Sequence, residues 1–428
     1  MDLPSLRSRP RTPGRRCRSR RGDGRGRHGG PRGRHRRRGR SRRSPHRTHR
    51  GDGSGGARPR RVVQGRRPRR RRFPRSRWSQ RRPARVGVPA RGGGRPLSGA
   101  RRALARVTPV APGHRDAVAD PSGSPGSLPA PFDEAVEVDA DGSPVRVLVR
   151  RAGRGAPLVI AAHGITANAV AFSPLATALA GTATIAALDL RGRGDSAGHP
   201  GPFGLAAHAA DVWRVADALG ADTAVLAGHS MGAYVVARAA HLAPTRTRHL
   251  VLLDGGLPLT DAPPDDPDAV LEATIGPALA RLEMSWPDLD AVLDFWRAHP
   301  SLGDHEAWDE RLVAYVRHDV GEAVDGRLRS RASAAAIRRD GRDVLLDPDA
   351  TGAAATTTVP TTLVRAARGL LGDPDSPLIP AATRERFRRL RPDATVVELP
   401  GHLNHYTMLW DDAGIEAIAA AIKRVLAA

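Results

Sequence analysis

The sequence predicts an α/β fold over residues 131–428, in which helices cover both faces of a mostly parallel sheet. Short continuous apolar runs recur along this region, and such runs are typical of strands buried on both faces. Segments with apolar residues three and four positions apart, the spacing of one helix face, lie between the runs. Strands that alternate with helices form parallel sheets, because the chain must cross over before the next strand begins.

The expected elements follow in order from residue 133. Apolar residues alternate through Val136–Val138 and Val145–Val149 on either side of the turn signal Asp141-Gly142, which predicts a hairpin of two strands. Buried strands are predicted at the runs Pro157–Ala162, Thr184–Leu188, Ala224–Ala227, Leu250–Leu253, Thr362–Val364 and Thr395–Val397. Apolar positions that share one face predict helices over 205–219 and 415–426.

Residues 258–350 interrupt this alternation with helical signals and no convincing strand. Leu289, Val292 and Trp296 share one helix face, and Trp308, Leu312 and Tyr315 share another. We expect a helical cap, inserted before the last two strands, over the carboxyl ends of the strands, where open α/β sheets bind ligands. The predicted core then comprises residues 131–257 and 351–428.

The charge distribution separates residues 1–130 from the rest of the chain. They hold 40 of the 69 Lys and Arg residues but only 5 of the 44 Asp and Glu residues, a net charge of +35, whereas the remaining residues carry −10. Arg, Gly, Pro and Ser dominate, and large apolar residues are few. Such a segment cannot bury enough apolar surface to offset its chain entropy, so we predict disorder there.

Three interpretations of the basic segment are open. An Arg-dense tail can bind nucleic acid by neutralising phosphates, so nucleic acid is a partner only if the segment belongs to the protein. A targeting peptide is disfavoured as an export signal, because no apolar stretch follows any Arg pair. The interpretation we favour is translation of GC-rich upstream DNA from a misplaced start, since the chain has 68 Arg and a single Lys, Lys423.

Composition also excludes several classes of protein. The single cysteine, Cys17, excludes an internal disulfide framework and a zinc site built from cysteines. No apolar run of 18 residues occurs, so we expect no transmembrane helix, no membrane partner and a cytoplasmic location. No pattern in the sequence sets an oligomeric state.

A candidate nucleophile lies in Gly228–Gly232, which reads Gly-His-Ser-Met-Gly. The stretch follows a predicted buried strand and opens a helical segment, which is the context that a Gly-x-Ser-x-Gly nucleophile elbow requires. The tight turn leaves no room for bulky flanking residues and exposes the hydroxyl of Ser230. A serine hydroxyl is a poor nucleophile at neutral pH, so a base is needed.

Two histidines follow the last predicted strand, His402 and His405, and we favour His405 as the base. The acid that orients it is ambiguous. Asp373 and Asp375 lie in the loop after the strand at 362–364, and Asp254 ends the preceding strand. We favour Asp373, with Asp254 and Asp375 as alternatives.

The tetrahedral intermediate of acyl transfer needs hydrogen-bond donors. The backbone N–H of Met231, directly after the nucleophile, is one candidate. The second is the N–H of Ile165, in the loop after the strand that ends at Ala162, where Gly164 allows close approach. We interpret His163 as a residue that orders this loop rather than as a second base.

Taken together, residues 133–428 resemble the α/β-hydrolase fold family, in the form that carries a helical cap. The resemblance rests on His163-Gly164, the stretch 189–196 (Asp-Leu-Arg-Gly-Arg-Gly-Asp-Ser), the Ser230 elbow and the terminal His405, which follow the family's order. The chain departs from the family at the acid, since Asp373 is one position later than the usual Gly-x-x-Asp spacing from Gly369. Asn404 also replaces the glycine that commonly precedes the histidine.

The resemblance implies a serine hydrolase that uses no cofactor or metal and cleaves a carboxylic ester of medium-sized hydrophobic character through an acyl-enzyme. Serine at the elbow disfavours the dehalogenases and epoxide hydrolases, which carry Asp there. Aromatic residues of the cap are expected to bind the substrate: Trp286, Phe295, Trp296, Trp308 and Tyr315. A C–C bond hydrolase or a lactonase would use the same residues. Alternatives of another class are a non-catalytic ligand receptor and a polyanion-binding protein.

Overall fold

The computed structural model describes residues 128–302 and 308–427. The predictions for the basic segment 1–130 therefore fall almost wholly outside the described residues, and so does the polyanion-binding alternative that depends on it. Among the described residues, no helix is both long enough and apolar enough to cross a membrane.

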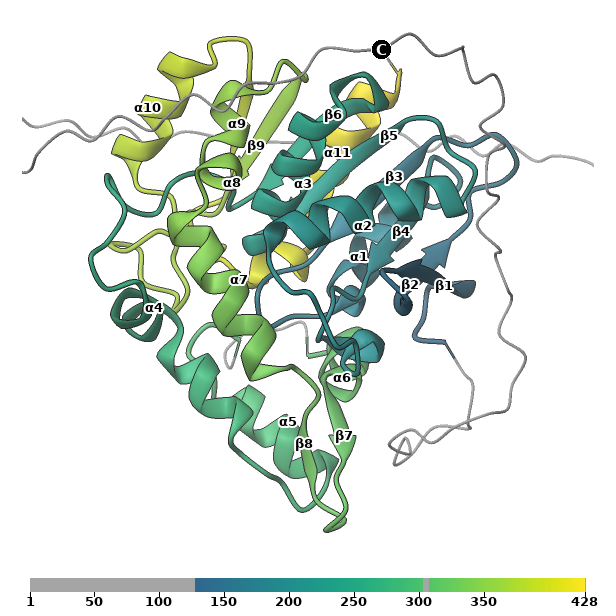
Figure 1. Cartoon of the computed structure of the whole chain (residues 1–428), viewed down its shortest axis with the longest axis vertical. Helices are drawn as coiled ribbons and strands as arrows, with labels where there is room; N and C mark the ends of the chain where they lie inside the picture. The colour runs from purple at the N-terminus through teal and green to yellow at the C-terminus, as the bar shows by residue number, and fades with distance from the viewer. Residues whose placement is uncertain (1–127, 303–307, 428) are drawn as a thin grey trace, which may run out of the picture. The chain divides into compact units, whose positions relative to one another are not determined.

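Within the described residues, eight strands form one sheet in the order β1-β2-β4-β3-β5-β6-β9-β10 (Figure 1). Their bounds are β1 (Glu134–Ala140), β2 (Ser143–Arg150), β3 (Leu158–Ala162), β4 (Thr184–Leu188), β5 (Ala224–His229), β6 (Thr247–Leu253), β9 (Thr361–Arg365) and β10 (Thr395–Glu398). The predicted hairpin β1–β2 is antiparallel and pairs antiparallel to β4. All neighbours from β4 to β10 are parallel, which confirms the mostly parallel sheet.

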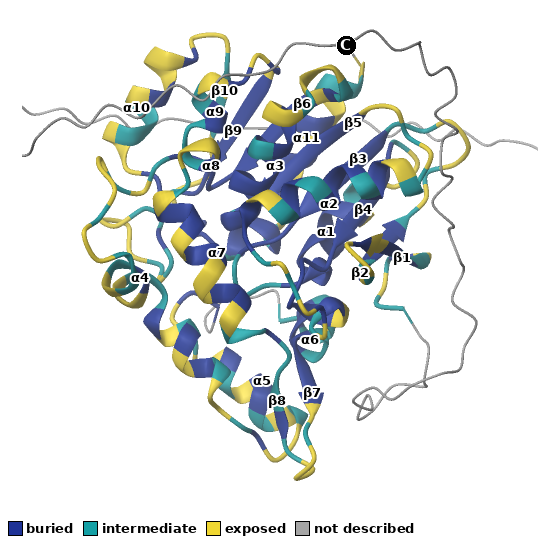
Figure 2. Cartoon of the chain, viewed as in Figure 1, coloured by how far each residue is buried: buried dark blue, intermediate teal, exposed yellow. Residues whose placement is uncertain are grey.

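Successive strand residues point to opposite faces of the sheet, so the continuous apolar runs make both faces apolar. Helices cover both faces. On one face, Val159 belongs to the apolar core that includes residues of α1 (Ser173–Ala178) and α11 (Asp412–Ala427). On the other, Ile160 belongs to the core that includes residues of α2 (Leu205–Ala218) and α3 (Met231–Leu242). The central strands are buried throughout (Figure 2), as their continuous apolar runs predict. A further helix, α10 (Ala381–Leu390), lies between β9 and β10 in the chain.

The segment between β6 and β9, which we call the cap, is mainly helical, and most of its elements gather at one end of the sheet (Figure 1). Its helices are α4 (Pro267–Leu282), α5 (Leu289–Arg297), α6 (Glu310–Asp319), α7 (Ala334–Leu346), α8 (Pro348–Thr351) and α9 (Ala353–Thr356). The expectation of no strand here is wrong, because β7 (Val320–Glu322) and β8 (Leu328–Ser330) form a short antiparallel hairpin. Three-residue strands are too short to produce an alternating pattern that sequence reading can detect.

Candidate active site

Ser230 occupies the sharp turn between β5 and α3, with a φ of 56° and a ψ of −122°. A positive φ is uncommon for a residue with a side chain, and it persists only where the surroundings impose it. Two glycines allow the turn to close: a Cβ atom at Gly228 would lie 2.2 Å from the Gly232 carbonyl oxygen, and one at Gly232 would lie 2.0 Å from that of Ala162. The predicted strand–turn–helix context of the elbow is therefore present.

His405 and Asp254 are in direct contact. The Nδ1 atom of His405 lies 2.8 Å from Oδ2 of Asp254, and both side chains are buried. The backbone orients the carboxylate, because its Oδ1 accepts the N–H of Ala366 at 3.2 Å while the Asp254 N–H donates to the Val364 carbonyl at 2.8 Å. A carboxylate can only accept, so this contact places the ring proton on Nδ1 and leaves Nε2 free to act as a base.

The expected contact of His405 with Asp373 is not present. Asp373 and Asp375 are both exposed, and the Asp373 carboxylate accepts the N–H of Asp375 at 2.8 Å within its own turn. The physical reason is the course of the loop, which turns with a positive φ of 77° at Gly372 and leaves both carboxylates in solvent. Asp254, directly at the end of β6, is the carboxylate that lies under the His405 loop.

The preference for His405 over His402 agrees with how far each side chain is buried. The His402 side chain is 64% exposed, and its Nε2 lies 3.6 Å from a carboxylate oxygen of Asp411. His405 is buried and lines the same cavity as Ser230. Of the two, His405 alone is among the described residues that line this cavity.

Both predicted oxyanion donors, Met231 and Ile165, also line this cavity. Met231 is the first residue of α3, where backbone N–H groups lack partners within the helix. The loop that carries Ile165 passes close to the nucleophile, since a Cβ atom at Gly164 would lie 3.2 Å from Cβ of Ser230. The serine, the histidine and both donor residues therefore meet at one site.

His163 is fully buried and orders the loop, as the sequence analysis expects. Its Nδ1 hydrogen donates to the Gly164 carbonyl at 2.7 Å, and its Nε2 accepts the N–H of Leu190 at 3.0 Å. Burial lowers the pKa of His163 to about 4. The ring is therefore neutral at physiological pH, with both nitrogens already engaged, and it is not a second base.

His229, the residue before Ser230, contacts His405 in a way that the sequence does not indicate. Its ring centroid lies 4.6 Å from that of His405, and its Nε2 lies 2.9 Å from the His405 carbonyl oxygen, to which it donates. Burial, and next the proximity of His405, hold the pKa of His229 well below its ordinary value. In the motif it is only an unspecified position, so no sequence signal marked it.

The cavity at Ser230 has a volume of about 1030 Å³, open space at its mouth included. The cap contributes residues such as Leu271, Ile275 and Val344, and the C-terminal part contributes Trp410. No Asp, Glu, Lys or Arg is among the described residues that line it. The part of the cavity wall that the described residues form is thus apolar apart from hydroxyl groups, imidazoles and backbone.

Most of the aromatic residues expected to bind substrate pack elsewhere. Of the five, Tyr315 alone is among the described residues that line the cavity. Phe295 packs against Trp286 and Trp296, with ring centroids 5.6 and 5.9 Å apart, inside the cap. Trp308 lies under the guanidinium of Arg297. The periodic aromatic stripes of the cap therefore serve mainly in packing, as part of the apolar core that includes Val159 of the sheet.

One group of residues has the composition of a metal site, namely Asp189, Asp195 and His318. Its ligand atoms already have partners. His318 Nε2 lies 2.7 Å from Asp189 Oδ2, and Asp195 forms an ion pair with Arg331 at 2.6 Å. This arrangement is a satisfied polar cluster, and none of the three residues lines the cavity at Ser230.

Comparison with known proteins gives a consistent result. Residues 157–406 match the family described as alpha/beta hydrolase fold. The chain is 32% identical over 260 residues to 2-(acetamidomethylene)succinate hydrolase of Mesorhizobium japonicum, which covers 60% of this chain and 84% of the relative. It is 34% identical over 155 residues to N-formylmaleamate deformylase of Pseudomonas putida, covering 35% of this chain and 55% of that relative.

Solved structures agree with this result. The crystal structure of E-2-(acetamidomethylene)succinate hydrolase superimposes with a TM-score of 0.55 at 27% identity, covering 69% of this chain and 99% of that one. The thioesterase domain from the curacin biosynthetic pathway superimposes with a TM-score of 0.52 at 22% identity, over 69% of this chain and 99% of that domain, a likeness of fold alone.

Proposed function

Since the chain belongs to the α/β hydrolase fold family, we propose that it is a serine hydrolase with Ser230, His405 and Asp254 as its catalytic triad. The observation that carries this proposal is the buried 2.8 Å contact between Asp254 and His405, which lines the same cavity as Ser230. A triad is recognised by the geometry and roles of its members rather than by their sequence positions.

The geometry supports a two-step acyl transfer. Asp254 holds the Nδ1 proton of His405, so that Nε2 takes the hydroxyl proton of Ser230 while its oxygen attacks the substrate carbonyl. The N–H groups of Met231 and Ile165 bind the oxyanion. His405 then gives its proton to the departing alkoxide, and an acyl-enzyme remains. A water molecule, deprotonated by His405, attacks the ester carbon and releases the carboxylic acid with Ser230 restored.

The cavity favours an uncharged, medium-sized hydrophobic carboxylic ester as substrate. Because no charged side chain of the described residues lines it, a substrate carboxylate would lose its hydration without gaining a cationic partner, which is costly. An apolar acyl group instead gains free energy from burial against residues such as Leu271, Ile275 and Trp410.

A second candidate is hydrolysis of a bond other than a simple ester, a C–C bond or a lactone, by the same residues. The similar proteins keep it open, because their names denote a hydrolase of 2-(acetamidomethylene)succinate and a deformylase of N-formylmaleamate rather than esterases. Succinate and maleamate derivatives carry carboxylates, however, and a cavity whose described lining residues are uncharged suits them poorly. A non-catalytic receptor would have no need of the buried His405–Asp254 pair.

The test begins with fluorophosphonate labelling of the wild-type chain and of Ser230→Ala, followed by a screen of p-nitrophenyl esters of graded acyl length. Each neutral ester is paired with an ester of the same length that ends in a carboxylate. We expect labelling at Ser230 only, and kcat/KM values that favour the neutral member of each pair. Labelling of folded Ser230→Ala at the wild-type rate would contradict the serine-hydrolase proposal, whereas a preference for the carboxylate members would contradict the substrate class. Lactones and C–C substrates complete the screen.

A further inference from the structure

The stretch Asp189–Ser196, which follows β4, takes no part in the proposed triad, yet one of its side chains reaches the oxyanion loop. Arg193 is fully buried. Its Nε–H donates to the Ile165 carbonyl at 3.0 Å, and its Nη1 donates to the Arg191 carbonyl at 2.9 Å. The guanidinium thus ties the loop after β4 to the loop after β3.

The two peptide groups that flank the Cα atom of Ile165 are each held by a hydrogen bond. The peptide that contains its N–H also contains the Gly164 carbonyl, which accepts from His163 at 2.7 Å. The next peptide contains the Ile165 carbonyl, which accepts from Arg193 at 3.0 Å. Only φ and ψ of Ile165 connect these two planes, so fixing both planes fixes the direction of the N–H. An oxyanion donor acts through such preorganisation, because no free energy is then spent on turning it during the reaction.

The cap anchors Arg193. Asp340, on α7, accepts from Arg193 Nη1 at 2.5 Å and from the Gly204 N–H at 2.7 Å, and its Oδ2 lies 3.0 Å from Nε2 of His208. Burial alone would raise the pKa of Asp340, but the Arg193 guanidinium, and next the contact with His208, hold it below its ordinary value. The carboxylate therefore stays ionised, and the ion pair fixes the guanidinium plane that bonds Ile165.

We propose that Arg193, anchored by Asp340 of the cap, is a positioning residue that holds the Ile165 peptide in the orientation in which its N–H binds the oxyanion. The inference rests on the proposed function and adds to it a role for the loop after β4. It also makes the cap part of the oxyanion support, in addition to its part in the wall of the cavity.

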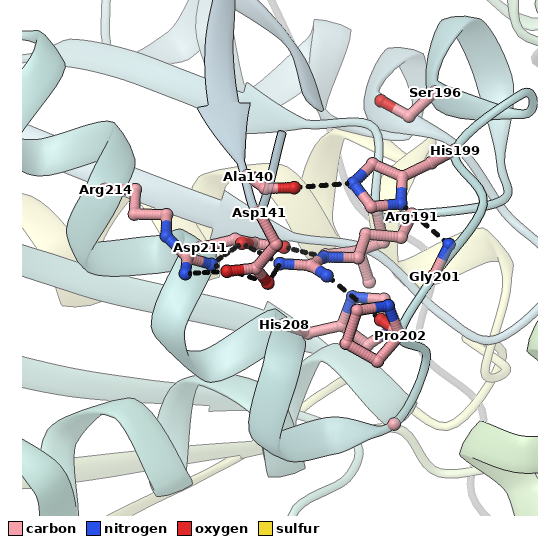
Figure 3. A network of polar contacts seen from close by, with 12 residues as sticks. Ala140, Asp141, Arg191, Ser196, His199, Gly201, Pro202, His208, Asp211 and Arg214 are labelled. Carbon is pink, nitrogen blue, oxygen red and sulfur yellow. Dashed lines mark hydrogen bonds and ion pairs between the residues drawn. The ribbon is translucent and has the colours of Figure 1, made fainter. Parts of the chain in front are cut away.

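Arg191 provides a matched control two residues away. It is equally buried, and it bonds Asp211 (Nε–Oδ2, 2.6 Å), Asp141 (Nη2–Oδ2, 2.8 Å) and the Pro202 carbonyl (Nη1–O, 3.0 Å), as Figure 3 shows. These partners join α2, the β1–β2 turn and the loop before α2. A substitution of Arg191 thus removes a buried arginine of the same loop without removing a bond to Ile165.

The experiment compares Arg193→Lys with Arg191→Lys, using the best p-nitrophenyl ester of the screen. Lysine keeps the charge beside the carboxylates, but its single nitrogen cannot bond Asp340 and the Ile165 carbonyl in the arginine geometry. Three quantities are measured: kcat and KM, the affinity for a boronic acid that forms a tetrahedral adduct, and the affinity for the uncleaved amide analogue of the ester. Thermal melting reports stability.

We expect Arg193→Lys to lower kcat about 10- to 100-fold with little change in KM, the range that follows from a misdirected oxyanion donor. Boronic acid affinity should fall by a similar factor, whereas amide affinity should hold. Arg191→Lys should lower the melting temperature and leave all three quantities near wild type. A purely structural role for Arg193 would instead make the two variants behave alike.

Folded Arg193→Lys with wild-type kcat and boronic acid affinity would overturn the inference. If Arg193→Lys does not fold, the double variant Arg193→Gln/Asp340→Asn takes its place, because the two buried charges are then removed together. Its kcat and boronic acid affinity are judged by the same outcomes. The two proposals fail separately. A wild-type chain that neither reacts with the fluorophosphonate nor cleaves any ester contradicts the proposed function, whereas an active wild-type enzyme with an unaltered Arg193 variant contradicts only the role of Arg193.

Discussion

Asp254 meets His405 from the end of β6, although the two residues are 151 positions apart in the chain. Asp254 has a positive φ of 44°, which turns its side chain as the strand ends. Its neighbour Gly255 has no room for a side chain, because a Cβ atom there would lie 2.2 Å from the Ser230 carbonyl oxygen. Asp254, Gly255 and Ser230 are therefore packed as one unit where β5 and β6 end.

This contact predicts which aspartate matters for catalysis. Asp254→Asn should lower kcat about 10⁴-fold, because an amide in place of the carboxylate favours the wrong tautomer of His405. Asp373→Asn is the matched control, since Asp373 is exposed and bonds only within its own turn. It should leave kcat within about twofold of wild type. Steady-state kinetics on both folded variants checks the prediction, and equal effects would exclude Asp254 as the acid.

The packing of Gly255 against the elbow predicts that Gly255→Ala is severe. The added methyl group cannot fit 2.2 Å from a backbone oxygen, so the elbow must shift, at a cost of about 2 kcal/mol or more. Gly401→Ala is the control, because a Cβ atom at Gly401 would have no neighbour within 4 Å. The free energy of unfolding in urea and the rate of fluorophosphonate labelling should both fall for Gly255→Ala alone. Wild-type stability and labelling in that variant would show that the two strand ends pack less tightly than described.

Much of this arrangement could be predicted from the sequence, for physical reasons. The parallel strands are buried on both faces, so they appear as apolar runs, and the elbow is a local turn with its own glycine spacing. The carboxylate that contacts His405 could not be predicted, since Asp254 and Asp373 both follow a strand and both stand beside glycine. Which loop turns inward depends on packing against a histidine far along the chain. Local spacing carries no information about that packing.

The cap shows the same limit. Its aromatic spacing marked helix faces that must be buried, and α5 and α6 formed as predicted. An apolar face can pack against other cap residues or line the cavity, and the two cases produce the same pattern. Trp296 packs against Phe295 of the cap, whereas Tyr315 lines the cavity.

The contact between His229 and His405 predicts a graded effect of substitution at His229. His229→Leu removes the donor to the buried His405 carbonyl, an interaction worth about 1–3 kcal/mol when one partner is left unsatisfied. We therefore expect kcat to fall about tenfold or more. His229→Gln keeps an N–H donor and should recover much of the loss. Equal kcat values for the two folded variants would mean that the hydrogen bond does not position His405.

Buried neutral histidines predict how stability depends on pH. Burial lowers the pKa of His163 and of His249 to about 4, from the ordinary value of 6.5 that each regains on unfolding. Between these two values the unfolded chain binds more protons than the folded one. These two histidines should therefore lower the free energy of unfolding as the pH drops below 6.5, and their contribution should level off near pH 4. The amount is on the order of 3 kcal/mol for His163 and smaller for His249, which is less deeply buried.

Urea unfolding at pH 7, 6, 5 and 4 measures this slope, and two variants assign it. His163→Gln and His249→Gln should each reduce the proton uptake on unfolding by about one. They should differ in activity, because His163 bonds the Gly164 carbonyl of the oxyanion loop, whereas His249 contacts Thr362 Oγ1 at 2.9 Å and is not among the described residues that line the cavity. A loss of kcat is therefore expected for His163→Gln alone. If His163→Gln left the proton uptake on unfolding unchanged, His163 would have to be protonated in the folded state, and its neutral loop-ordering role would be wrong.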